Sequence, residues 1–133
     1  MGSIGYTYKY DVSIPIPDFH DVVLLMKDRL SQHSDIIVTS WGHVIDGNLH
    51  LNVTTPNVCE KESNILSLIE PFIFEKVVER GGSISAEHGL GQCKNNYLPL
   101  MKDSISITLM HKLKNEFDPN HILNPGKFLP SPL

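Results

Sequence analysis

The chain has 133 residues, is 41% hydrophobic and 20% charged, and carries a formal net charge of −4 with its seven histidines neutral. This length suits one domain with a core of its own, since single domains typically hold about 100–200 residues. The longest apolar runs, such as residues 22–26, are far shorter than the roughly 20 residues of a membrane span. No stripe of lysine and arginine is present, which argues against nucleic-acid binding. The two cysteines, Cys59 and Cys93, in a chain without a secretory signal predict reduced thiols in an intracellular compartment.

The first predicted element is a strand over residues 6–14, where aromatic and β-branched residues cluster. Pro15 and Pro17 are expected to end it, because proline cannot donate a hydrogen bond to a strand ladder. Asp18 is expected to cap a helix that ends near His33, since apolar residues recur there at helical spacing.

A tight hairpin is predicted next, with strands over residues 35–45 and 48–54 and Asp46-Gly47 as a two-residue loop of type I′ character. This register places His43 opposite His50, with Cβ atoms about 4.5–5.5 Å apart. The apolar face of the hairpin should pack on the helices. The other face points away from the core of the domain and carries Trp41, His43, Ile45, Asn48, His50 and Asn52.

A long helix is predicted over residues 60–80, with a kink or a late start at Pro71 and with Gly81 and Gly82 ending it. Residues 83–86 predict a fourth strand. The resulting order predicts an α+β fold, the ferredoxin-like βαββαβ arrangement of an antiparallel sheet with helices on one face. A further helix over residues 104–116 and a tail rich in turn residues are expected to follow.

Two clusters carry candidate chemistry. His43 and His50, side by side on a rigid hairpin, can serve as two ligands of a divalent metal such as zinc, which normally needs a third protein ligand and an open position. The alternative is a polar cross-strand pair on an exposed sheet face. In the second cluster, Glu87 can supply the third ligand and His88 a general base, since histidine titrates near pH 6.5. The alternative there is a glycine-rich turn with a solvated Glu-His pair.

Lys9 interrupts the aromatic first strand. On a sheet face that also carries imidazoles, its ammonium group can bind a carboxylate. Alternatively, it is an edge-strand lysine that deters aggregation.

Four motifs in this order resemble the C-terminal part of the FAD-linked oxidases, the vanillyl-alcohol-oxidase-type flavoproteins. The branch that the chain resembles most is that of the D-2-hydroxyglutarate dehydrogenases, beside the cytochrome-type D-lactate dehydrogenases, a branch also labelled actin-interacting protein. The motifs are residues 8–13 (YKYDVS), 42–52 (GHxxDGNLHLN), 85–91 (SAEHGLG) and 117–127 (FDPxxILNPGK).

The resemblance implies a role for each matching residue. His43, His50 and Glu87 match the divalent-metal ligands of the family, with zinc in the hydroxyglutarate branch. Lys9 and Asn52 match contacts to the substrate carboxylate. His88 matches a substrate contact that also takes the proton of the C2 hydroxyl, which the metal polarises while hydride leaves for FAD. The resemblance also implies a mitochondrial full-length protein acting on a small 2-hydroxy acid.

The chain departs from the family pattern at Ile45, where the family usually has glycine, and we expect the pocket to be narrowed or reshaped there. The family's flavin-binding domain precedes the matched part, so residues 1–133 are expected to supply the substrate and metal half and to bind no FAD alone. Two alternatives remain open: a stand-alone metal-binding module, and a protein-interaction fragment with actin as one partner. Exposure of the histidine-bearing face also predicts homo-oligomers.

Overall fold

The computed structural model describes residues 5–131. The chain divides into two compact units, residues 1–87 and residues 88–133. Among the described residues, no helix combines the length and the apolar character needed to cross a bilayer. Cys59 and Cys93 are both free cysteines, as predicted, and both are exposed.

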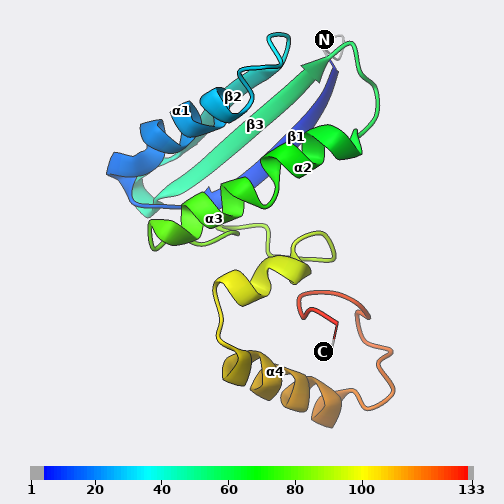
Figure 1. The fold of residues 1–133 in the computed structure, drawn as a ribbon. Coiled ribbons are helices and arrows are strands. Elements are labelled where there is room, and N and C mark those ends of the chain that lie inside the picture. The colour runs from blue at the N-terminus through cyan, green and yellow to red at the C-terminus, as the bar shows by residue number, and fades with distance from the viewer. Residues whose placement is uncertain (1–4, 132–133) are drawn as a thin grey trace. The chain divides into compact units, whose positions relative to one another are not determined.

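The first unit is built on an antiparallel sheet of three strands, β1 (Gly5–Ser13), β2 (Ile37–His43) and β3 (Asn48–Pro56), in the order β1-β3-β2 (Figure 1). All three strands were predicted from the sequence. Because β3 is central, the side chains of β1 and β2 flank its own side chains along both edges. Polar groups of β3 are therefore more readily buried than those of the two outer strands.

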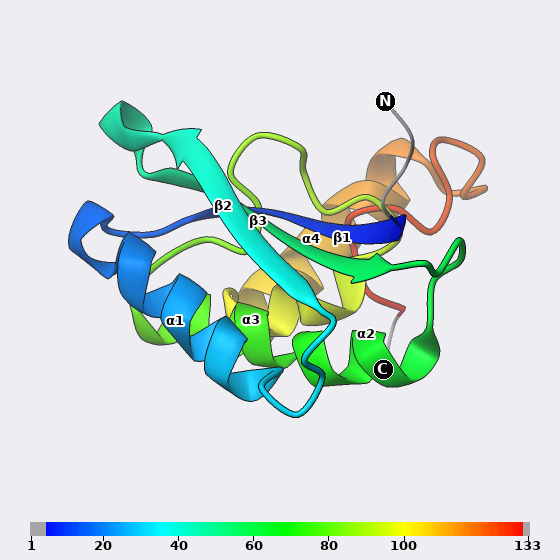
Figure 2. The ribbon, with the colours of Figure 1, turned by 90° about the horizontal axis from the view of Figure 1, so that it is seen from above.

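Three helices lie on one face of this sheet, α1 (Phe19–Arg29), α2 (Ser63–Ile69) and α3 (Phe72–Glu79) (Figures 1 and 2). Asp18 occupies the predicted N-cap position of α1, although its side chain makes no capping hydrogen bond. The predicted long helix is divided at Pro71, as the sequence indicated. The fully buried side chains of the core include Val12, Val22, Met26, Leu49, Leu51, Val53, Ile69, Ile73, Phe74 and Val77.

The α+β class is confirmed, but only an isolated β-bridge is present where the fourth strand was predicted. Ser13 and Ser83 exchange backbone hydrogen bonds of 2.9 and 2.8 Å at the outer edge of β1, where a fourth strand would lie. The Ser83 hydroxyl then donates to the carbonyl of Ser85 at 2.8 Å. Such a local side-chain bond offers the backbone an alternative to the ladder. The described sheet is therefore three-stranded rather than four-stranded.

The prediction of a two-residue hairpin loop is wrong. His43 pairs with Asn48, so the loop comprises residues 44–47, a 3-10 turn (Val44–Asp46) followed by Gly47 at φ +69°. A type I′ loop needs positive φ at both central residues, and Asp46 lies in the 3-10 turn instead. The register of β2 on β3 consequently shifts by two residues from the expected one. A shift of two keeps every paired side chain on its predicted face.

Ile45 leaves the sheet altogether as a result of this longer loop. Its relative exposure is 101%, at the tip of the hairpin. The expectation that Ile45 extends the histidine-bearing face is therefore not met, and its side chain does not narrow that surface within the first unit.

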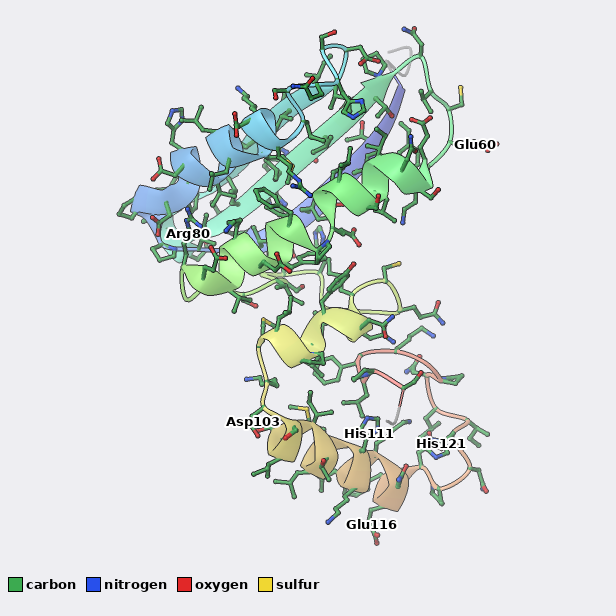
Figure 3. All side chains as sticks on the ribbon, viewed as in Figure 1. Glu60, Arg80, Asp103, His111, Glu116 and His121 are labelled. Atoms are coloured by element: carbon green, nitrogen blue, oxygen red, sulfur yellow. The ribbon has the colours of Figure 1, made fainter. Side chains whose placement is uncertain are left out.

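The second unit contains a 3-10 segment, η3 (Asn95–Leu100), which was not predicted, and α4 (Ser104–Phe117), which was. Asp103 caps α4 by accepting hydrogen bonds from the Ser106 N–H at 2.9 Å and from the Ser106 hydroxyl at 2.7 Å. These two hydrogen bonds lower the pKa of the Asp103 carboxyl. Figure 3 shows Asp103 at the start of α4, with His111 and Glu116 farther along it. Large apolar side chains of α4 stay exposed, namely Ile105, Leu109, Leu113 and Phe117.

Candidate metal and substrate site

The sheet face opposite the helices is polar, and we call it the polar face. Each strand contributes every second residue to it, and the register arranges these residues in rows across the sheet, three of which matter for the site. These three rows are Ser13, Asn48 and His43; Asp11, His50 and Trp41; and Lys9, Asn52 and Thr39.

A candidate metal cluster lies on the polar face. One ligand atom each from His43, His50 and Glu87 lies within 4.8 Å of the other two. His43 Nε2 is 4.0 Å from Glu87 Oε1, and the two imidazole rings are 5.6 Å apart between centroids. Two ligands of one tetrahedral zinc lie about 3.5 Å apart, given bonds of about 2.0–2.2 Å. A small closure of these side chains would therefore suit a cation.

The donor set fits a divalent cation. Two imidazoles and one carboxylate form a ligand set that catalytic zinc sites use, with a further position left for water or substrate. The His43 and Glu87 side chains are about half exposed, at 52% and 50%. The cluster is thus open on the side where another ligand would enter.

The face that carries the histidines points away from the core, as predicted, but His50 and Asn48 on it are buried, at 7% and 2% exposure. The reason is the central position of β3. The Trp41 ring stacks on the His50 imidazole with centroids 4.0 Å apart and planes inclined by 20°. On the other side, Asp11 of β1 lies opposite His50 in the ladder.

Asn48 is a candidate site residue that no role was predicted for. Neither atom of its buried side-chain amide has a hydrogen-bond partner among the described residues. Buried polar groups normally have partners, so this amide has the capacity to bind water or a ligand group on the polar face. Its pairing with His43 could be recognised only once the true register was known.

Lys9 and Asn52 lie directly opposite each other on β1 and β3, one row from His50. Lys9 is exposed and Asn52 is half-buried. The two residues that the resemblance assigns to the substrate carboxylate therefore share a row of the polar face. Because β1 is an edge strand, the protective role of an exposed lysine also applies to Lys9.

His88 directly follows Glu87 in the chain and opens the second unit, where it is exposed. Gly89 and Gly91 follow it with φ of +72° and +55°. Left-handed backbone at both positions explains the requirement for glycine there.

Asp11 is the second residue that the sequence did not single out as part of the site. Its side chain is 2% exposed, and one carboxylate oxygen accepts the Glu87 N–H at 2.9 Å. The signal that could have found it is an acidic residue in a strand otherwise rich in aromatic and β-branched residues.

Comparison with known proteins gives the class of this chain. Residues 1–128 match the family model of the FAD linked oxidases, C-terminal domain, and the chain belongs to that family.

Its curated relatives narrow the resemblance further. The chain is 47% identical over 95% of its length to the mitochondrial D-2-hydroxyglutarate dehydrogenase of Danio rerio, and covers 23% of that protein. It is 42% identical over 96% of its length to the rat (Rattus norvegicus) protein of the same name, again covering 23%. A protein of Schizosaccharomyces pombe provisionally named a mitochondrial D-lactate dehydrogenase is 42% identical over 92% of the chain and is covered to 24%. The chain thus spans about a quarter of the length of these relatives.

Proposed function

We propose that residues 1–133 form the substrate- and metal-binding part of an FAD-dependent D-2-hydroxy-acid dehydrogenase of mitochondria. The observation that carries this proposal is the cluster of His43, His50 and Glu87 on the polar face of a chain in the FAD-linked oxidase family. D-2-hydroxyglutarate is the compound in the names of the Danio rerio and rat relatives, and D-lactate, in the name of the Schizosaccharomyces pombe relative, is the alternative.

The reaction is the oxidation of a secondary alcohol to a ketone. Oxidation at C2 removes the hydroxyl proton, which goes to a base, and a hydride, which FAD would accept when bound, so that the product is the 2-oxo acid. FAD would be held mainly by the flavin-binding domain of the family, and the residues of this chain would supply the substrate and metal half.

The residues of this chain orient the substrate and move its proton. Lys9 attracts a substrate carboxylate as a point charge, and the Asn52 amide opposite it donates a hydrogen bond. His88 accepts the proton of the C2 hydroxyl through an imidazole nitrogen, because neutral imidazole is a competent base near neutral pH.

His43, His50 and Glu87 would hold a divalent cation, zinc by preference given two imidazoles and a carboxylate. When bound, such a cation polarises the oxygen atoms of the substrate as a Lewis acid.

The metal part of the proposal is tested by calorimetric titration of the chain with Zn²⁺. We expect one equivalent to bind, and His43→Ala and His50→Ala each to abolish or greatly weaken binding. His33→Ala, a histidine of the loop that precedes β2, serves as the matched control and should bind like the wild type. Equal Zn²⁺ affinity in the wild type and in His50→Ala would overturn the metal site.

The catalytic part is tested in a longer protein that carries the flavin-binding part in addition to this chain. His88→Gln should lower kcat by about 100-fold or more, since a positioned base contributes about 100–10,000-fold. Lys9→Met should mainly raise KM for the hydroxy acid. Unchanged turnover in His88→Gln would remove this residue from the mechanism.

A further inference from the structure

Asp11 is the buried carboxylate on the polar face, and it lies beside two of the three candidate metal ligands. It is 2% exposed and sits opposite His50 in the β1–β3 ladder. Burial of a charged carboxylate is costly unless neighbouring groups stabilise it. The groups that Asp11 contacts therefore indicate what this carboxylate does in the structure.

Those contacts join Asp11 to both His50 and Glu87. Its Oδ1 lies 3.8 Å from His50 Nδ1, and its Oδ2 accepts the Glu87 N–H at 2.9 Å. The main-chain carbonyl of Asp11 also accepts the Ala86 N–H, at 3.4 Å. A single residue of β1 thus contacts the ring of one candidate ligand and the backbone of another.

We propose that Asp11 is a positioning residue that holds His50 and Glu87 for one divalent cation, an inference that rests on the metal site proposed above. Metal-binding histidines commonly donate their second ring N–H to a carboxylate, which fixes the tautomer and the ring orientation. With Nδ1 facing Asp11, Nε2 is the nitrogen that would bind the cation. A shift of about 1 Å would bring the 3.8 Å contact to hydrogen-bond length.

Trp41 completes this arrangement from the other side of His50. Its indole ring stacks on the face of the imidazole with centroids 4.0 Å apart, and Asp11 Oδ1 lies 3.8 Å from Nδ1 of the same ring. The two contacts together restrict the orientation of the ring. The cation would then meet a ligand that is already oriented, which lowers the cost of binding.

The test compares Asp11→Asn with the matched control Asp46→Asn, which removes the same charge from the exposed hairpin loop. We expect Zn²⁺ affinity, measured by competition with a chelator, to fall about 10–100-fold in Asp11→Asn, as for other residues that support metal ligands. Asp46→Asn should bind Zn²⁺ like the wild type. In a His50→Gln background, Asp11→Asn should cause a smaller further loss, since its effect through the His50 ring is then removed.

A second readout separates positioning from general support of the fold. Long-range ¹H–¹⁵N correlation spectra of the metal-free chain report which ring nitrogen of His50 carries the proton. We expect the Nδ1–H tautomer in the wild type and a shift toward the Nε2–H tautomer in Asp11→Asn. An Nε2–H tautomer in the wild type would overturn the inference even if Asp11→Asn fails to fold.

The outcomes also distinguish this inference from the proposed function. Absence of Zn²⁺ binding in the wild type overturns the metal site and, with it, the role of Asp11 toward a cation. Wild-type binding that Asp11→Asn leaves unchanged in both affinity and tautomer overturns the role of Asp11 alone.

Discussion

Trp41 and His50 face each other across β2 and β3, and their rings stack with centroids 4.0 Å apart. Trp41 is the only tryptophan of the chain. Its fluorescence therefore reports directly on the ring that we propose as a metal ligand.

This contact predicts that Cu²⁺ or Co²⁺ quenches the tryptophan emission in a saturable way, because such ions quench by close approach to the indole. Zn²⁺ bound first should protect the emission from quenching by Co²⁺, since both ions would occupy the same site. The measurement is a fluorescence titration of the wild type, with His33→Ala as the control. Quenching of the same affinity in His50→Ala would show that the ion binds elsewhere.

Gly42 is required by the close approach of β2 to β3. A Cβ atom at this position would lie 2.1 Å from the carbonyl oxygen of Asn48, which belongs to the backbone and cannot rotate away. Gly42→Ala should therefore displace the hairpin next to His43 and weaken Zn²⁺ binding. Ser40→Ala, on the same strand and face, should leave binding unchanged. Calorimetry on both variants checks this, and wild-type affinity in Gly42→Ala would contradict it.

Much of the fold could be predicted from local chemistry. The prolines after β1, the break at Pro71 and the glycines after α3 mark element ends that depend on backbone constraints alone. The assignment of hairpin residues to an apolar and a polar face was also predicted correctly. It depends on the alternation of side chains along each strand, which a register shift of two residues does not change.

The missed features depend on contacts that sequence periodicity does not contain. Asp46-Gly47 favours a two-residue loop, yet the chain forms a longer turn in which only Gly47 is left-handed. The burial of His50 and Asn48 follows from the central place of β3 in the sheet, and the role of Asp11 from its contact with Glu87. Each of these needs the partner strand or segment to be known.

Leu51 tests the packing of the sheet on the helices. It lies on central strand β3 with 0% exposure, on the face opposite His50. Leu51→Ala should lower the free energy of unfolding by about 2–5 kcal/mol, through lost burial and the cavity left behind. Leu24→Ala, at a position 47% exposed on α1, should cost much less. Urea unfolding followed by circular dichroism measures both, and equal costs would contradict the burial of Leu51.

The exposed apolar side chains predict self-association of the isolated chain. Trp41 and Ile45 are 57% and 101% exposed on the first unit, and Leu109 and Leu113 are 54% and 60% exposed on α4. Ile45→Ser and Leu109→Ser should each shift a concentration-dependent association toward monomer. Light scattering coupled to size exclusion measures the mass. A monomer at every concentration for the wild type would contradict this prediction.

Asp118 predicts a pH dependence of the second unit. The residue is 3% exposed, and the Lys114 ammonium group together with the N–H groups of Ile122 and Leu123 lowers the pKa of its carboxyl. A carboxyl whose pKa is lower in the folded state than in the unfolded state stabilises the fold above the unfolded pKa of about 3.9. That stabilisation is lost as the pH falls from there toward the folded pKa.

Asp118→Asn should therefore unfold several degrees below the wild type at pH 7, with the difference shrinking toward pH 3. Hydrogen exchange of the Ile122 and Leu123 amides should accelerate in the variant at pH 7, since these N–H groups donate to Oδ1 and Oδ2 of Asp118 at 3.0 Å. Glu116→Gln, an exposed change on α4, is the control and should leave both amides protected. A thermal difference that stays constant from pH 7 to pH 3 would mean that the charge of Asp118 is not what stabilises the tail.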